Sequence, residues 1–170
     1  MKKILFVLFV VFVANLGCKK MDTGDGLCAC SPVQTPPILL VIKGANGVDM
    51  LNPATNGYFA SSNIKLYYQN GTAEQQIEFN INQPFAVGNS TTEKVEFYQL
   101  RSSYLLDLLS SKNPPNIYIK LGNGTPRQLK ATMVGGQKYK VDKLLVNDVE
   151  ATGETGTVKN IVPNIFYFNL

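Results

Sequence analysis

The sequence has no histidine and no tryptophan among its 170 residues, and it has only three cysteines. The missing histidine excludes Ser-His-Asp and Cys-His catalysis, histidine general bases and most zinc sites. The formal net charge is +4, and no basic run carries interleaved aromatic residues, so we expect no nucleic acid partner. We therefore predict a protein that is not an enzyme, with no catalytic residues, cofactor or bound metal. A histidine-independent hydrolase is the least favoured alternative.

An apolar run long enough for a transmembrane helix is missing too. Residues 4–14 are all apolar and follow Lys2 and Lys3, whereas a membrane span needs about 20 such residues. A short basic region before an apolar stretch of this length is typical of a secretion signal. The sequence therefore predicts export rather than a membrane-spanning helix.

The end of this apolar stretch resembles the lipobox of bacterial lipoproteins. In a lipobox, a small residue precedes a cysteine that receives a diacylglyceryl group and becomes the new N-terminus, and Gly17 and Cys18 match that arrangement. Asn15 and Leu16 depart from the usual aliphatic and small residues. The resemblance implies a lipoprotein signal peptide over 1–17 and a lipid on Cys18 whose acyl chains hold the protein in a membrane. We expect the protein to lie in the cell envelope, anchored to the outer membrane on either its periplasmic or its surface face.

A tether follows the lipidated cysteine. Residues 19–37 are rich in Gly, Pro, Thr, Ser and Asp and have no apolar periodicity, which predicts a flexible tether over 18–37 ahead of a folded domain over 38–170. Cys28 and Cys30 lie in this tether. Three interpretations stay open for them: free or mixed-disulfide thiols, a strained internal disulfide, or a metal site.

From residue 38 onward, short apolar or alternating runs recur between turn signals, which is the all-β pattern. We predict an antiparallel β-sandwich of about seven to nine short strands. The segment 102–111 also fits a helical face, but the nearby Pro114 and Pro115 favour a strand there. Expected strands are 38–44, 63–69, 75–82, 93–100, 116–122, 127–134, 137–146 and 165–170.

The clearest hairpin joins the runs 63–69 and 75–82 through a turn centred on Asn70 and Gly71. Strand alternation then turns Ile77, Phe79 and Ile81 to one face. This pattern predicts a single inward-facing apolar stripe along the second strand.

Short motifs that copy functional sites have simpler explanations. The DTG at 22–24 lies in the tether, and Ser62 with Lys65 satisfies S-x-x-K but falls at the start of a strand, so we interpret both as chance matches. The stretch VDMLNP offers one carboxylate, too few for calcium. We predict a structural turn there, in which Asp49 or Asn52 caps backbone amides.

Tyrosines are frequent, and Tyr67, Tyr98 and Tyr118 fall on positions opposite the apolar stripes. A tyrosine-lined sheet face can stack sugars or a partner protein, so these three residues form a possible binding face for a glycan or protein at the cell surface. The alternative is a second packed sheet face, and the absence of tryptophan weakens the sugar interpretation.

The chain resembles small, uncharacterised lipoproteins of Bacteroidota in its lipobox-like start, in VDMLNPATN ahead of NIKLYYQNG, and in NIYIKLGNGTPRQLK. The likeness covers most of residues 38–146 and consists of a D-x-L-N-P turn and a Y-I-K-x-G-x-G strand-turn. It implies a similar folded part but no activity. We therefore expect a lipid-anchored envelope protein with a non-catalytic binding or assembly role. An accessory or inhibitory subunit of a surface complex is the alternative.

Overall fold

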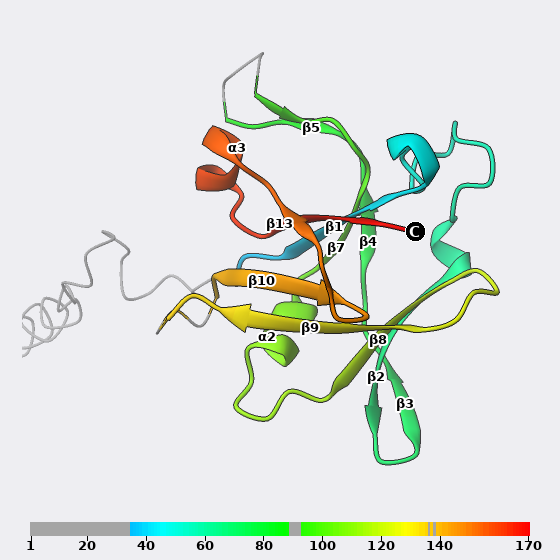
Figure 1. The fold of residues 1–170 in the computed structure, drawn as a ribbon, viewed down its shortest axis with the longest axis vertical. Helices are drawn as coiled ribbons and strands as arrows, with labels where there is room; N and C mark the ends of the chain where they lie inside the picture. The colour runs from blue at the N-terminus through cyan, green and yellow to red at the C-terminus, as the bar shows by residue number, and fades with distance from the viewer. Residues whose placement is uncertain (1–34, 89–92, 136, 138) are drawn as a thin grey trace, which may run out of the picture. The chain divides into compact units, whose positions relative to one another are not determined.

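The computed structural model describes residues 35–88, 93–135, 137 and 139–170. The expected signal peptide, Cys18, Cys28, Cys30 and nearly all of the expected tether lie outside these residues. Within them the chain forms two large β-sheets and a small ribbon of two strands (Figure 1). The first strand begins at Ile38.

Sheet A has five strands in the order β12-β13-β1-β7-β4: β1 (Ile38–Lys43), β4 (Asn80–Asn82), β7 (Gln99–Ser102), β12 (Thr152–Gly153) and β13 (Ile165–Asn169). Sheet B has six in the order β11-β10-β9-β8-β2-β3: β2 (Ile64–Asn70), β3 (Ala73–Gln76), β8 (Asn116–Leu121), β9 (Arg127–Met133), β10 (Val141–Val146) and β11 (Val149–Glu150). The ribbon pairs β5 (Phe85–Ala86) with β6 (Lys94–Val95). The described helices are α2 (Tyr104–Leu109), α3 (Gly156–Ile161) and the 3₁₀ turns η1 (Ala45–Gly47) and η2 (Ser61–Asn63).

The main core lies between sheets A and B. Alternate residues of each strand face it, so the apolar positions predicted from period-two alternation are buried. The all-β, sandwich-like fold predicted from the sequence is confirmed. Sheet A contributes Ile38, Leu40, Ile42, Leu100, Phe166 and Phe168, and sheet B contributes Ile64, Leu66, Ile117, Ile119, Leu121, Leu129, Leu144 and Val146.

A smaller second core covers the other face of sheet A. Leu39 and Val41 of β1 and Ile165 of β13 pack there against Val87 and Val95, next to the ribbon. The central strand β1 is therefore buried on both faces, which explains why its sequence ILLVIK is a continuous apolar run rather than an alternating one.

The pairing differs from the sequence prediction in two respects. β1 runs parallel to β13, although the remaining strand pairs are antiparallel. The described residues also form thirteen strands, more than expected, because two predicted runs are split and because the short strands β5, β11 and β12 lie outside the predicted runs. The run 93–100, for example, divides between β6 in the ribbon and β7 in sheet A.

The run 75–82 is not one strand. β3 pairs with β2 in sheet B, whereas β4 pairs with β7 in sheet A, so the chain crosses from one sheet to the other at residues 77–79. Ile77, Phe79 and Ile81 still all pack against the main core, because the crossing follows the side of the sandwich. The predicted inward stripe is confirmed, but the predicted continuous strand is wrong.

The turn between β2 and β3 lies one residue later than expected. Asn70 pairs with Ala73, so the two loop residues are Gly71 and Thr72. Gly71 has a φ of 62°, a conformation that glycine adopts without steric cost.

The segment 102–111 forms a helix, not the expected strand. Leu105, Leu106 and Leu109 of α2 are buried in the main core, at a spacing that only a helix places on one face. The Ser102 hydroxyl accepts a hydrogen bond from the backbone nitrogen of Leu105 at 3.3 Å. A single short helix fits before Pro114, so the prolines did not exclude it.

The D-x-L-N-P stretch is a structural turn, as predicted. Asp49 accepts hydrogen bonds from the backbone nitrogens of Leu51 at 2.9 Å and Tyr98 at 2.7 Å, and Asn52 accepts one from Ala54 at 2.9 Å. The Asp49 carboxylate thus ties the turn after β1 to the segment before β7.

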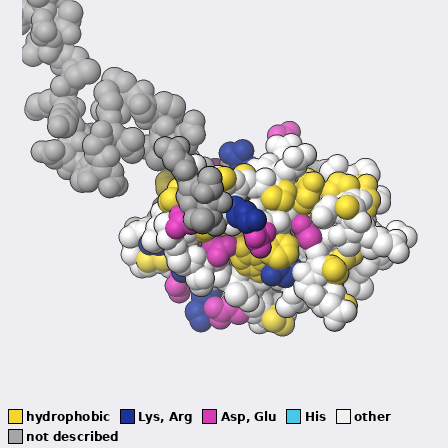
Figure 2. All heavy atoms as spheres, turned by 90° about the horizontal axis from the view of Figure 1, so that it is seen from above, with side chains coloured by type: hydrophobic (Ala, Val, Ile, Leu, Met, Phe, Trp, Pro, Cys, Tyr) yellow, Lys and Arg dark blue, Asp and Glu magenta, His cyan; other side chains and the backbone are white. Residues whose placement is uncertain are grey.

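The surface carries charges of both signs. On the face seen in Figure 2, acidic and basic side chains lie close together between separate hydrophobic patches. No helix in the described ranges has the length and apolar character that crossing a membrane requires.

Candidate binding face on sheet B

The face of sheet B that points away from the main core is polar, as strand alternation requires. The side chains on it come from the same strands whose other residues fill the core. They are Lys65, Tyr67 and Gln69 of β2, Asn116, Tyr118 and Lys120 of β8, and Gln128, Lys130 and Thr132 of β9. We call this surface the outer face.

Two of the three predicted tyrosines meet at the centre of the outer face. Tyr67 and Tyr118 are paired across β2 and β8, and their rings stack with centroids 5.5 Å apart. Tyr67 is only 7% exposed, while Tyr118 is half-buried. Burial raises the pKa of Tyr67, and the nearby Glu74 carboxylate and Tyr118 raise it further. Tyr67 therefore serves as packing on this face, and only Tyr118 presents part of its ring.

Tyr98 lies elsewhere. It precedes β7, its backbone nitrogen is bound by Asp49, and its side chain packs against the main core. The structure therefore does not join Tyr98 to the other two tyrosines.

The S-x-x-K residues do not share a helix, since Ser62 lies in η2 and Lys65 in β2.

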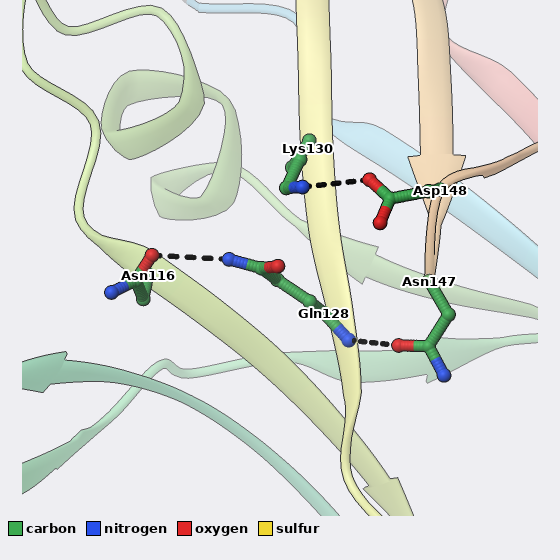
Figure 3. Close-up of polar contacts among 5 residues, drawn as sticks. All are labelled: Asn116, Gln128, Lys130, Asn147 and Asp148. Carbon is green, nitrogen blue, oxygen red and sulfur yellow. Dashed lines mark hydrogen bonds and ion pairs between the residues drawn. The ribbon is translucent and has the colours of Figure 1, made fainter.

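A row of polar contacts runs across the outer face from β8 to the turn between β10 and β11 (Figure 3). Gln128 donates from Nε2 to Asn116 Oδ1 at 3.0 Å. Its backbone nitrogen donates to Asn147 Oδ1 at 2.7 Å. Lys130 Nζ lies 2.6 Å from Asp148 Oδ1. The side chains of Gln128 and Lys130 are thereby held along β9.

Asn147 and Asp148 adopt the left-handed conformation, with φ angles of 51° and 64°. They are the two loop residues of the hairpin in which Val146 pairs with Val149, and this tight turn requires positive φ at both positions. The sequence prediction missed this turn. The Asn-Asp pair directly after the apolar run of β10 is the signal that identifies it, because both residues tolerate this conformation.

A cavity of about 280 Å³, which we call the β8–β9 cavity, opens beside this row. Leu109, Pro114, Pro115, Leu129 and Ala131 give it an apolar lining, and Asn116, Gln128 and Lys130 stand at it as polar residues. Asn116 Nδ2 and Gln128 Oε1 have no hydrogen-bond partner in the part of the chain that the structure describes. The cavity thus combines an apolar lining with the amide groups of Asn116 and Gln128, a combination that is typical of small-ligand sites.

In comparisons with known proteins, no family model, curated protein or solved structure matches the chain. Among the described residues, no group of three or more Cys, Asp or Glu side chains is placed to hold a metal ion. The candidate site therefore rests on the geometry of the β8–β9 cavity.

Proposed function

We propose that the protein is a lipid-anchored cell-envelope protein that binds a ligand at the β8–β9 cavity without chemically changing it. The observation that carries the binding role is this apolar cavity with the Asn116 and Gln128 amides at its edge. The sequence supports the anchor, because the apolar stretch of 4–14 leads to Gly17 and Cys18. Anchoring through Cys18 keeps the domain at the membrane, where its ligand is another component of the envelope.

Lipidation of Cys18 is tested by metabolic labelling with a tagged palmitate. The wild-type chain should be labelled and should fractionate with membranes, whereas Cys18→Ala should lose the label, since the acyl chains are attached to this sulfur. Cys28→Ala is the matched control and should be labelled like the wild type. Equal labelling of Cys18→Ala and the wild type, or no labelling of either, contradicts the anchor.

The binding role is tested in cells by photo-crosslinking. Asn113 is exposed in the loop before the cavity-lining Pro114, so a photoreactive residue at 113 should form a defined adduct. The same residue at the exposed Thr72, on the tip of the β2–β3 hairpin, is the control and should not. The adduct at 113 should weaken in Gln128→Ala, which removes the side-chain amide at the cavity. No adduct at 113, or equal adducts at 72 and 113, contradicts binding at this cavity.

A further inference from the structure

Strand β9 continues past the end of its pairing with β8. The β8–β9 pairs are Ile117↔Leu129, Tyr118↔Gln128 and Ile119↔Arg127. Beyond Leu129, β9 continues to Met133 and is paired only with β10. Figure 1 shows the chain before β8 curving away from β9. One side of β9 is therefore left open within sheet B.

The backbone hydrogen bonds show which residues face this opening. Gln128 bonds Asn147 through both of its backbone groups, donating to Asn147 Oδ1 at 2.7 Å and accepting from Asn147 N at 2.9 Å. Its N–H and C=O thus point toward β10. Because this direction alternates along an antiparallel strand, the N–H and C=O groups of Lys130 and Thr132 also point toward β10. The N–H and C=O of Ala131 then point to the opposite side.

The bond at the end of β9 agrees with this alternation. The backbone nitrogen of Val134 donates to Lys140 O at 2.9 Å, so the backbone N–H of Val134 also points toward β10. The N–H and C=O of Met133 therefore point away from β10, like those of Ala131. The next β8–β9 pair would place Pro115 opposite Ala131, and proline has no N–H to donate. Within the described ranges, no hydrogen bond joins Pro115 to Ala131. The N–H and C=O of Ala131 therefore face the β8–β9 cavity.

We infer that this cavity binds an extended peptide segment, which adds to the open edge of β9 in line with β8. The inference rests on the proposed binding function and names its ligand class. An unpaired strand edge binds a peptide through main-chain hydrogen bonds and reads alternate side chains in pockets. The two open residues, Ala131 and Met133, are spaced as antiparallel pairing requires.

The arrangement at Ala131 favours a peptide over an N-acetylated sugar. A residue in a strand presents its N–H and C=O side by side, and these groups come from two successive peptide units. A single trans amide points its N–H and C=O in opposite directions, so one acetamido group can bond only one of the two. An amino acid residue flanked by two amides can bond both.

The cavity lining specifies the side chain that such a peptide presents. Paired residues in an antiparallel sheet point their side chains to the same face. The ligand residue opposite Ala131 therefore points toward Leu109, Pro114 and Leu129, which requires a small apolar side chain. Its neighbour points to the outer face near Lys130, where polar side chains are accommodated.

Amide hydrogen exchange on the full chain in detergent tests the open edge directly. Without ligand, the amides of Ala131 and Met133 should exchange much faster than those of Lys130 and Thr132, which are bonded to β10. Equal protection at all four positions overturns the inference. The proposed function does not depend on this result, because the crosslinking at residue 113 tests it separately.

The peptide ligand is tested with a library of blocked pentapeptides that carry alanine, valine or leucine at positions two and four. Members should bind the detergent-extracted full chain, and N-methylation of the residue opposite Ala131 should weaken binding about tenfold, because it removes one main-chain hydrogen bond. Peptide binding should also slow exchange at Ala131. Equal affinity of the N-methylated peptide, no retention of any library member, or binding of an N-acetylglucosamine oligomer in place of peptides overturns the inference.

Discussion

Replacing Ile77 with alanine should lower the free energy of unfolding by about 2–5 kcal/mol. Ile77 is fully buried in the main core at the point where the chain crosses from sheet B to sheet A. Its backbone nitrogen also donates to Leu66 O at 2.8 Å. Truncation therefore leaves a cavity between the sheets at the only stretch that joins β3 to β4, where the backbone has little freedom to fill it.

Urea denaturation of Ile77→Ala and of two neighbouring controls measures this effect. Gln76→Ala and Glu78→Ala alter exposed side chains and should each change the free energy of unfolding by no more than about 0.5 kcal/mol. Phe79→Ala should fall between these values and Ile77→Ala, because Phe79 is only partly buried against the core. A loss at Gln76 equal to that at Ile77 contradicts the crossing described here.

The crossing also shows what alternation can and cannot predict. Ile77, Phe79 and Ile81 have the same period of two that a single strand would have, so the sequence predicted their burial correctly. It did not predict the change of sheet, because the hydrogen-bond partners of a strand leave no trace in its own alternation. The continuous run of β1 was interpretable for the opposite reason, since burial on both faces removes polar residues from the strand.

Helix α2 was missed because of the two prolines that follow it, not because its leucines lack a helical pattern. Leu105, Leu106 and Leu109 fit a helical face, and the following prolines appeared to leave too little room. Burial of three leucines in the main core decides the matter, and that burial depends on tertiary packing.

The candidate site was predictable only in part. Alternation placed Tyr67 and Tyr118 opposite the apolar stripes of their own strands, and the pairing of β2 with β8 brings the two side chains together. The burial of Tyr67 and the distant position of Tyr98 depend on neighbours from other strands. The open edge at Ala131 depends on where β8 begins relative to β9, a register that no residue in β9 encodes.

The buried Asn164 carries the second large effect: Asn164→Ala should lower the free energy of unfolding by about 2–4 kcal/mol. Its side chain is fully buried, accepting from Val141 N at 3.2 Å and donating to Tyr139 O at 3.1 Å. Its backbone oxygen accepts from Leu39 N at 2.9 Å. Asn164 thus ties the start of β10 in sheet B to β1 in sheet A. Alanine removes both of these side-chain bonds, the one from Val141 N and the one to Tyr139 O.

An aspartate at this position separates the hydrogen bonds from packing. Asn164→Asp keeps the shape but buries a carboxylate that cannot donate to Tyr139, so burial raises its pKa above the unfolded value of about 3.9. A group with a raised folded pKa is stabilising below its unfolded pKa, and this stability is lost as pH rises through the folded value. The deficit of Asn164→Asp relative to the wild type should therefore be large at neutral pH, shrink as the pH falls through the raised folded pKa, and be smallest below about pH 4, whereas that of Asn164→Ala should not follow pH in this way. Asn160→Ala, at an exposed position of α3, should change the free energy of unfolding by no more than about 0.5 kcal/mol. Parallel pH profiles for the two Asn164 variants would show that packing, and not this pair of hydrogen bonds, joins the sheets there.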